Sequence, residues 1–75
     1  MQVRETIVDA MMGLGRPIDG SFPGSAPLDL ESIEVVMLHD VLEQAFEVSI
    51  PASRVTPDSF ATLDSLVALV EELRS

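Results

Sequence analysis

Apolar side chains recur at intervals of three and four residues in three stretches of the chain, which is the spacing of one face of an α-helix. These stretches predict helices at Met1–Leu14, Ser32–Glu47 and Thr62–Arg74, and Thr62 belongs to the residue types that cap a helix N-terminus well. No stretch alternates between apolar and polar residues for long enough to form a strand. The pattern therefore predicts an all-α fold, a small helical bundle.

Gly and Pro residues interrupt the segment Gly15–Pro27 too often for a helix or strand of ordinary length, so it is predicted to be a long loop. Ile18 and Phe22 are the apolar residues that would attach this loop to the core. A second break falls at Ile50-Pro51, because the residue before a proline is disfavoured in helical geometry. The short stretch that follows, Ala52–Thr56, has room for one further turn.

The predicted second helix carries apolar residues on two faces when it is drawn with about 3.6 residues per turn. One face is wide enough to be the core face. The other face places three apolar residues beside polar ones, where a bundle helix usually has charged side chains only. A helix buried on all sides would explain this, but carboxylates are almost never buried without partners, and we therefore predict an apolar docking surface bordered by acids. The core face consists of Val35, Leu38, Leu42, Ala45 and Phe46, and the docking face of Ile33, Val36 and Met37 beside Asp40 and Gln44.

The chain is strongly acidic: its 75 residues, the size of a single domain, include 13 Asp and Glu against 4 Arg, and the formal net charge is −9. Such a chain repels phosphate backbones and anionic lipid headgroups, which argues against nucleic-acid and membrane partners. The segment from Asp29 to Glu47 contains six of the acids and no basic residue. This distribution favours protein partners with basic surfaces.

The absence of Cys excludes disulfides, thiol nucleophiles and Cys-ligated zinc, and the single His39 excludes a histidine-rich metal site. His39 also lacks a catalytic arrangement, because Asp40 points about 100° away around the helix. We therefore expect His39 at the edge of the core, hydrogen-bonded or half exposed, and we expect neither enzymatic activity nor a metal site. The charges among the first ten residues argue against a signal peptide and a membrane span, so we expect a cytoplasmic protein. We also expect the protein to be a monomer.

Several short sequences lie in the same order as in a known family. Glu31-Ser32-Ile33 opens an acidic helix after a Gly- and Pro-rich loop, Phe46 stands near the end of that helix, and Ile50-Pro51 follows. A later run, Phe60-Ala61-Thr62-Leu63, leads into the last helix. Over its whole length the chain resembles the acyl carrier proteins and the related peptidyl carriers, whose signature is Asp-Ser-Leu at the start of the second helix.

The resemblance implies a four-helix bundle whose third helix is short. It also implies that Ser32 carries a covalent 4′-phosphopantetheine arm, derived from coenzyme A, whose thiol holds an acyl or aminoacyl group as a thioester. A phosphopantetheinyl transferase would attach the arm, and acyl-loading and chain-processing enzymes with basic docking surfaces would be the other partners. The implied partner-binding residues are Glu31, Ile33, Glu34, Val36, Met37, Asp40 and Glu43.

The chain departs from the fatty-acid carriers at several positions. Asp-Ser-Leu is replaced by Glu31-Ser32-Ile33, and the preceding Leu-Gly-x by Leu28-Asp29-Leu30, without the Gly. His39 and Asp40 stand where fatty-acid carriers usually have apolar residues. These differences favour a discrete carrier of polyketide, nonribosomal peptide or related biosynthesis, with a housekeeping fatty-acid carrier as the alternative.

A literal Asp-Ser-Leu occurs at Asp64-Ser65-Leu66, which makes Ser65 a second candidate for modification. Ser65 is disfavoured because no Gly- and Pro-rich loop precedes it and no long acidic helix follows it. A hydroxyl near a helix start can also simply hydrogen-bond to free backbone N–H groups. Besides a specialised carrier and a fatty-acid carrier, one further interpretation remains open, in which the chain is an acidic helical interaction module that carries no prosthetic group.

Overall fold

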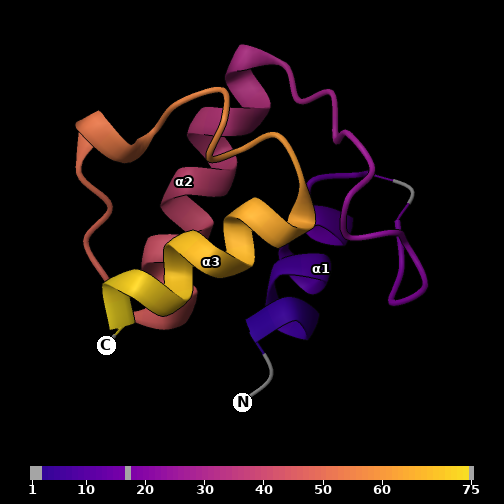
Figure 1. The fold of residues 1–75 in the computed structure, drawn as a ribbon, viewed down its shortest axis with the longest axis horizontal. Coiled ribbons are helices and arrows are strands. Elements are labelled where there is room, and N and C mark those ends of the chain that lie inside the picture. The colour runs from indigo at the N-terminus through magenta and orange to yellow at the C-terminus, as the bar shows by residue number, and fades with distance from the viewer. Residues whose placement is uncertain (1–2, 17, 75) are drawn as a thin grey trace.

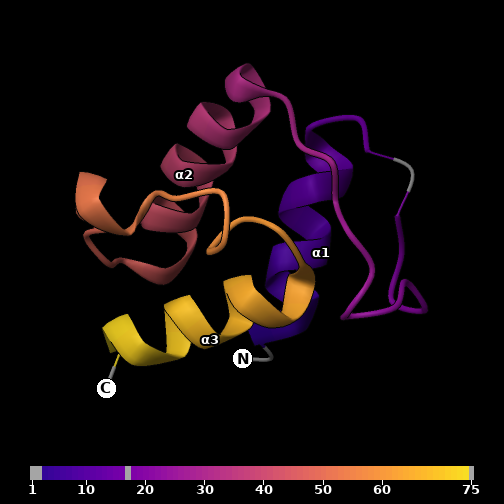
Figure 2. The ribbon, with the colours of Figure 1, turned by 45° about the horizontal axis from the view of Figure 1, so that its top comes forward.

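The computed structural model of the chain describes residues 3–16 and 18–74. It contains helices α1 (Val3–Gly13), α2 (Ser32–Phe46) and α3 (Leu63–Arg74), with a short 3-10 turn η1 (Ala52–Arg54) between α2 and α3. The helix α1 contacts both α2 and α3 (Figures 1 and 2), and the described residues include no strand. The chain is thus a small all-helical bundle, as the apolar spacing predicts. Met1 and Gln2 of the predicted first helix and Pro17 of the predicted loop lie outside the described residues.

The core is built by all three helices and by the segments between them. From α2 it takes Leu38, Leu42 and Phe46, which confirms the predicted core face, while Val35 and Ala45 are half buried against that core. Both residues that were expected to attach the long loop do so, because Ile18 is buried and Phe22 packs against the core. The remaining buried residues are Ile7, Val8, Met11, Leu28, Ile50, Phe60, Leu63, Leu66, Leu69 and Val70.

Three helix termini lie where local backbone geometry and capping place them. After α1, Gly15 has a φ of 88°, and the Arg16 N–H donates to the Met11 carbonyl at 3.1 Å, which places Arg16 directly under the end of the helix. The helix α2 ends at Phe46, one residue earlier than predicted, because Glu47 adopts a left-handed conformation with a φ of 54°. At the start of α3, the Thr62 hydroxyl accepts a hydrogen bond from the Ser65 N–H at 3.1 Å, which confirms Thr62 as the cap.

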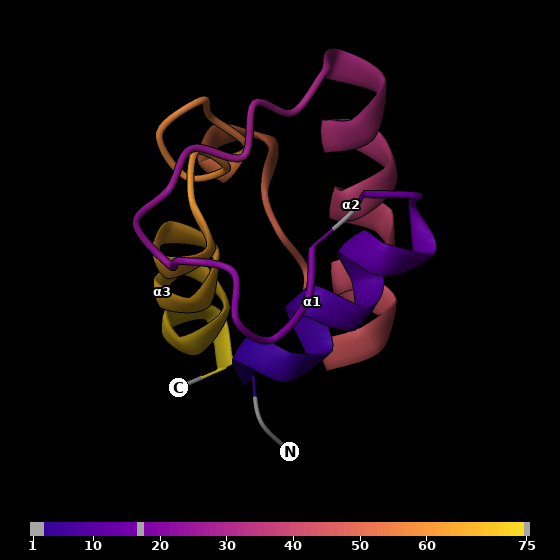
Figure 3. The same cartoon turned by 90° about the vertical axis from the view of Figure 1, so that its right-hand side faces the viewer.

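The long loop between α1 and α2 is fastened to the bundle along its length, and it runs past the start of α3 before it reaches α2 (Figure 3). The Arg4 guanidinium donates to the Phe22 carbonyl. Gly24 lies so close to α3 that a Cβ at this position would be 2.2 Å from the Asp64 carboxylate, while the Asp64 N–H donates to the Gly24 carbonyl at 3.1 Å. The Leu28 N–H then donates to the Ala61 carbonyl at 2.8 Å, so the loop and the start of α3 form one unit.

The opposite end of the bundle is held by two arginines. Arg54 of η1 makes a bidentate ion pair with Glu72 of α3, with N–O distances of 2.8 and 2.7 Å. The Arg54 hydrogen bonds and charge lower the pKa of the exposed Glu72 carboxyl. The Arg74 guanidinium lies 5.7 Å from the centre of the Phe46 ring, which links the ends of α2 and α3. Among the described residues, no helix is both long and apolar enough to cross a membrane.

Candidate functional site

Ser32 is the first residue of α2 and lies at the junction between the long loop and the helix. Its side chain is exposed. Within residues 3–16 and 18–74 the structure gives its hydroxyl no hydrogen-bond partner, so the oxygen is available to a reagent from outside. The first N–H groups of a helix and its dipole also favour negative charge at this place.

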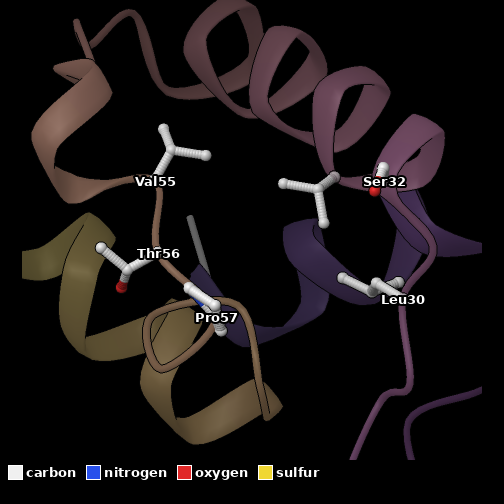
Figure 4. Close-up of a pocket in the computed structure, with 6 residues that line it drawn as sticks. Leu30, Ser32, Val55, Thr56 and Pro57 are labelled. Atoms are coloured by element: carbon white, nitrogen blue, oxygen red, sulfur yellow. The ribbon is translucent and has the colours of Figure 1, made fainter.

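A hollow of about 300 Å³ opens beside Ser32, between the start of α2 and the segment that follows η1. Figure 4 shows Ser32 and Leu30 on one side of this hollow and Val55, Thr56 and Pro57 on the other. A second hollow of about 230 Å³ shares Leu30 and Pro57 with the first and extends towards Phe60. The surface next to the Ser32 hydroxyl is therefore concave and mainly apolar.

Three apolar residues of α2 point away from the core, and we call them the α2 apolar patch: Ile33, Val36 and Met37. Their side chains are 65%, 66% and 45% exposed, respectively. The helix is thus not buried on all sides, and the predicted second face is a free surface of the described chain. Its position next to Ser32 places the exposed hydroxyl and the α2 apolar patch on the same end of the molecule.

The acids around the α2 apolar patch differ in how much of each carboxylate is free. Glu31 and Asp40 are exposed. Among the described residues, the Glu31 carboxylate accepts the Glu34 N–H in a capping box, and Asp40 accepts an i,i+4 hydrogen bond from Gln44 at 2.9 Å. Glu34 is 17% exposed, accepts a hydrogen bond from the Glu31 N–H at 3.0 Å and pairs with Arg16 at 3.3 Å. Glu34 therefore stabilises the start of α2 as well as bordering the patch.

Glu43 also has a task within the fold. Its carboxylate accepts a hydrogen bond from the Ile50 N–H at 2.7 Å, and Nε2 of His39 lies 2.9 Å from the Ile50 carbonyl oxygen. The two side chains thus hold the N–H and the carbonyl of Ile50, a buried residue in the segment between α2 and η1. His39 is partly buried, which confirms the prediction that it lies at the edge of the core in a hydrogen bond.

Ser65 contrasts with Ser32 in every respect that matters for modification. The oxygen of its hydroxyl lies 2.9 and 2.8 Å from the carbonyls of Ser59 and Thr62, which share its single proton. The same oxygen accepts from the Thr62 N–H at 3.1 Å. The Ser65 hydroxyl is therefore engaged within the fold, unlike that of Ser32.

Asp29, just before α2, has a φ of 51°, in the left-handed region that favours Gly. In the resemblance described above, this position would correspond to the Gly of Leu-Gly-x. Asp tolerates this conformation better than most residues, because its short polar side chain can interact locally. The departure in sequence thus leaves the backbone in a conformation that a Gly would also adopt.

One residue of this region could not be identified from the sequence. Arg16 follows α1, donates to the Leu28 carbonyl and to Glu34, and so joins the two ends of the long loop at the start of α2. These contacts link residues 12 and 18 positions apart, which no helical spacing indicates. The sequence shows only an isolated arginine.

The chain matches neither a protein-family model nor a curated protein.

Proposed function

We propose that the chain is a carrier protein whose Ser32 receives a 4′-phosphopantetheine arm and presents the attached acyl or aminoacyl thioester to partner enzymes. The observation that supports this most is the exposed hydroxyl of Ser32, which has no hydrogen-bond partner in the described part of the chain and lies at the start of an acidic helix beside the α2 apolar patch. The acyl carrier-like arrangement of three main helices and one short turn is part of the same proposal.

The surroundings of Ser32 fit such a group. In the modification, the Ser32 oxygen forms a bond to the β-phosphorus of coenzyme A, the pyrophosphate bond breaks, and adenosine 3′,5′-bisphosphate leaves. The hydroxyl proton passes to a base of the transferase. The N–H groups at the start of α2 stabilise the negative charge of the new phosphodiester.

The arm supplies a thiol, which a chain without Cys cannot provide itself. The protein then needs no catalytic side chain, because it holds the reacting group for other enzymes. The hollow lined by Leu30, Val35 and Val55 borders the attachment point with apolar surface along which the arm can lie.

Recognition by partner enzymes is assigned to the α2 apolar patch and the acids around it. Apolar side chains provide the buried centre of such an interface, and the exposed carboxylates of Glu31 and Asp40 provide a rim that attracts basic surfaces. Glu34 and Glu43 contribute charge to the same rim, although each also stabilises the chain itself. The departures from fatty-acid carriers, of which Asp40 is one, favour a discrete carrier of a specialised biosynthetic route.

Incubation with coenzyme A and a phosphopantetheinyl transferase of broad specificity tests this proposal. Intact mass should increase by one phosphopantetheine group in the parent and in Ser65→Ala, and should not change in Ser32→Ala. Ser32→Ala should keep the helical circular dichroism of the parent, because the exposed hydroxyl makes no contact that folding needs.

Modification of Ser32→Ala to the same extent as the parent would overturn the assignment of Ser32. An unmodified parent, under conditions in which a known carrier is fully converted, would favour an interaction module without a prosthetic group. In that case the α2 apolar patch would be the functional surface by itself.

A further inference from the structure

Arg16 occupies a position from which one side chain reaches both the long loop and the start of α2. One terminal nitrogen donates to the Leu28 carbonyl, and the other lies 3.3 Å from the Glu34 carboxylate. Glu34 in turn accepts the Glu31 N–H at 3.0 Å. The contacts of Arg16 therefore bracket Ser32, with one on the loop before it and the other on the first turn after it.

The backbone of Arg16 is itself fixed by the end of α1. Gly15 takes the left-handed conformation, and the Arg16 N–H donates to the Met11 carbonyl at 3.1 Å. Since Met11 is fully buried, Arg16 is anchored to the core of the bundle. A continuous series of contacts thus runs from the core through Arg16 to the residues on each side of Ser32.

The third nitrogen of the Arg16 guanidinium shows that this arrangement has a cost. The Nε–H of Arg16 is buried and has no hydrogen-bond partner among the described residues. Burying a donor without an acceptor is unfavourable, so the net contribution of Arg16 to stability is reduced. A planar fork that reaches two acceptors cannot be replaced by the single ammonium group of Lys.

We infer that Arg16 is a positioning residue for Ser32: it fixes the loop and the first turn of α2 so that the hydroxyl is held in one place for the transferase. This inference rests on the proposed function of Ser32. Arg16 does not touch the hydroxyl in the structure and acts only through Leu28 and Glu34. Loss of the two Arg16 guanidinium contacts leaves the α2 apolar patch intact but allows Ser32 to move before it is modified.

The test compares Arg16→Gln and Arg16→Lys with Arg54→Gln, a control that removes an arginine ion pair at the other end of the bundle. In steady-state kinetics with the transferase, both Arg16 variants should lose about tenfold or more in kcat, because small displacements of a reacting group have effects of this size. KM should stay within about twofold of the parent, since among the proposed docking residues Arg16 contacts Glu34 alone and touches neither the α2 apolar patch nor Asp40. Arg54→Gln should behave like the parent in both constants.

Arg16→Lys separates geometry from charge, because it keeps the positive charge and loses the fork. Equal defects in Arg16→Lys and Arg16→Gln support positioning, whereas full activity of Arg16→Lys would show that charge alone suffices and would overturn the inference. Parent-like kcat in Arg16→Gln would overturn it as well.

Amide hydrogen exchange provides a readout that does not depend on modification. Arg16→Gln should speed exchange at Glu31 and in the first turn of α2, and leave α3 amides such as Leu66 unchanged. If the parent accepts no arm at all, the proposed function of Ser32 fails, and exchange still decides whether Arg16 fixes this segment. Unchanged exchange at Glu31 would then refute the positioning role.

Discussion

The two faces of α2 are similar in composition and opposite in use. Leu38 and Leu42 are fully buried, whereas Ile33 and Val36 on the other side are 65% and 66% exposed. Hydrophobicity alone does not separate the two sets, because both consist of aliphatic side chains. The difference lies in whether another element covers them: one row builds the core, and the other is exposed and is the row that we propose for association.

The buried row should give the largest effect on stability. We expect Leu42→Ala to lower the free energy of unfolding by about 2–5 kcal/mol, because a fully buried leucine loses contacts and leaves a cavity. Met37→Ala is the matched control on the exposed row and should change the free energy of unfolding by less than about 0.5 kcal/mol. Urea unfolding followed by circular dichroism measures both, and equal losses in the two variants would show that the faces do not differ as described.

The acids beside the exposed row should divide in the same way. Glu43→Ala removes the acceptor of the Ile50 N–H, which should cost about 1.5 kcal/mol, the lower end for a bond to a charged group, since this carboxylate is partly exposed. Asp40→Ala loses only an exposed hydrogen bond from Gln44 and should cost less than about 0.5 kcal/mol. Urea unfolding of the two variants measures both losses. A larger loss of unfolding free energy in Asp40→Ala than in Glu43→Ala would contradict the roles that we give to these two acids.

The exposed row should give the smallest effect on folding and a clear effect on binding. Val36→Asp should keep the unfolding free energy within about 0.5 kcal/mol of the parent. It should weaken binding to the transferase by about tenfold, since it places a charge at the centre of the proposed interface. Thermal unfolding and titration calorimetry would check the two parts, and an unfolded Val36→Asp would mean that the faces have been assigned backwards.

The helices of this chain could be predicted from the sequence because their signals are local. Apolar spacing and the Gly and Pro breaks gave the described boundaries of α2 and α3 to within one residue. The predicted end of α2 was one residue too late, because Glu47 adopts a left-handed backbone conformation for which Glu has no strong preference. Thr62 was predictable because capping depends on residues three positions apart.

The candidate site was predictable in part, for the same reason. Helical spacing was sufficient to identify the α2 apolar patch, and the order of short sequences around Ser32 was sufficient to propose that residue. The inward roles of Glu34, Glu43 and Arg16 were not predictable, because they depend on partners brought together by the folded chain. In the sequence these residues are only charges, and a charge pattern does not show which of its members are already paired.

The fastening of the long loop has a consequence for engineering the protein. Long surface segments usually tolerate insertions and attached labels, because few contacts depend on their length. Here Gly24 and Leu28 each pair with the backbone at the start of α3, so the number of residues between them is set by that helix. An insertion between these two residues should shift one of the pairings and disturb Asp64 and Ala61, which are far away along the chain, so tags and fluorophores belong elsewhere.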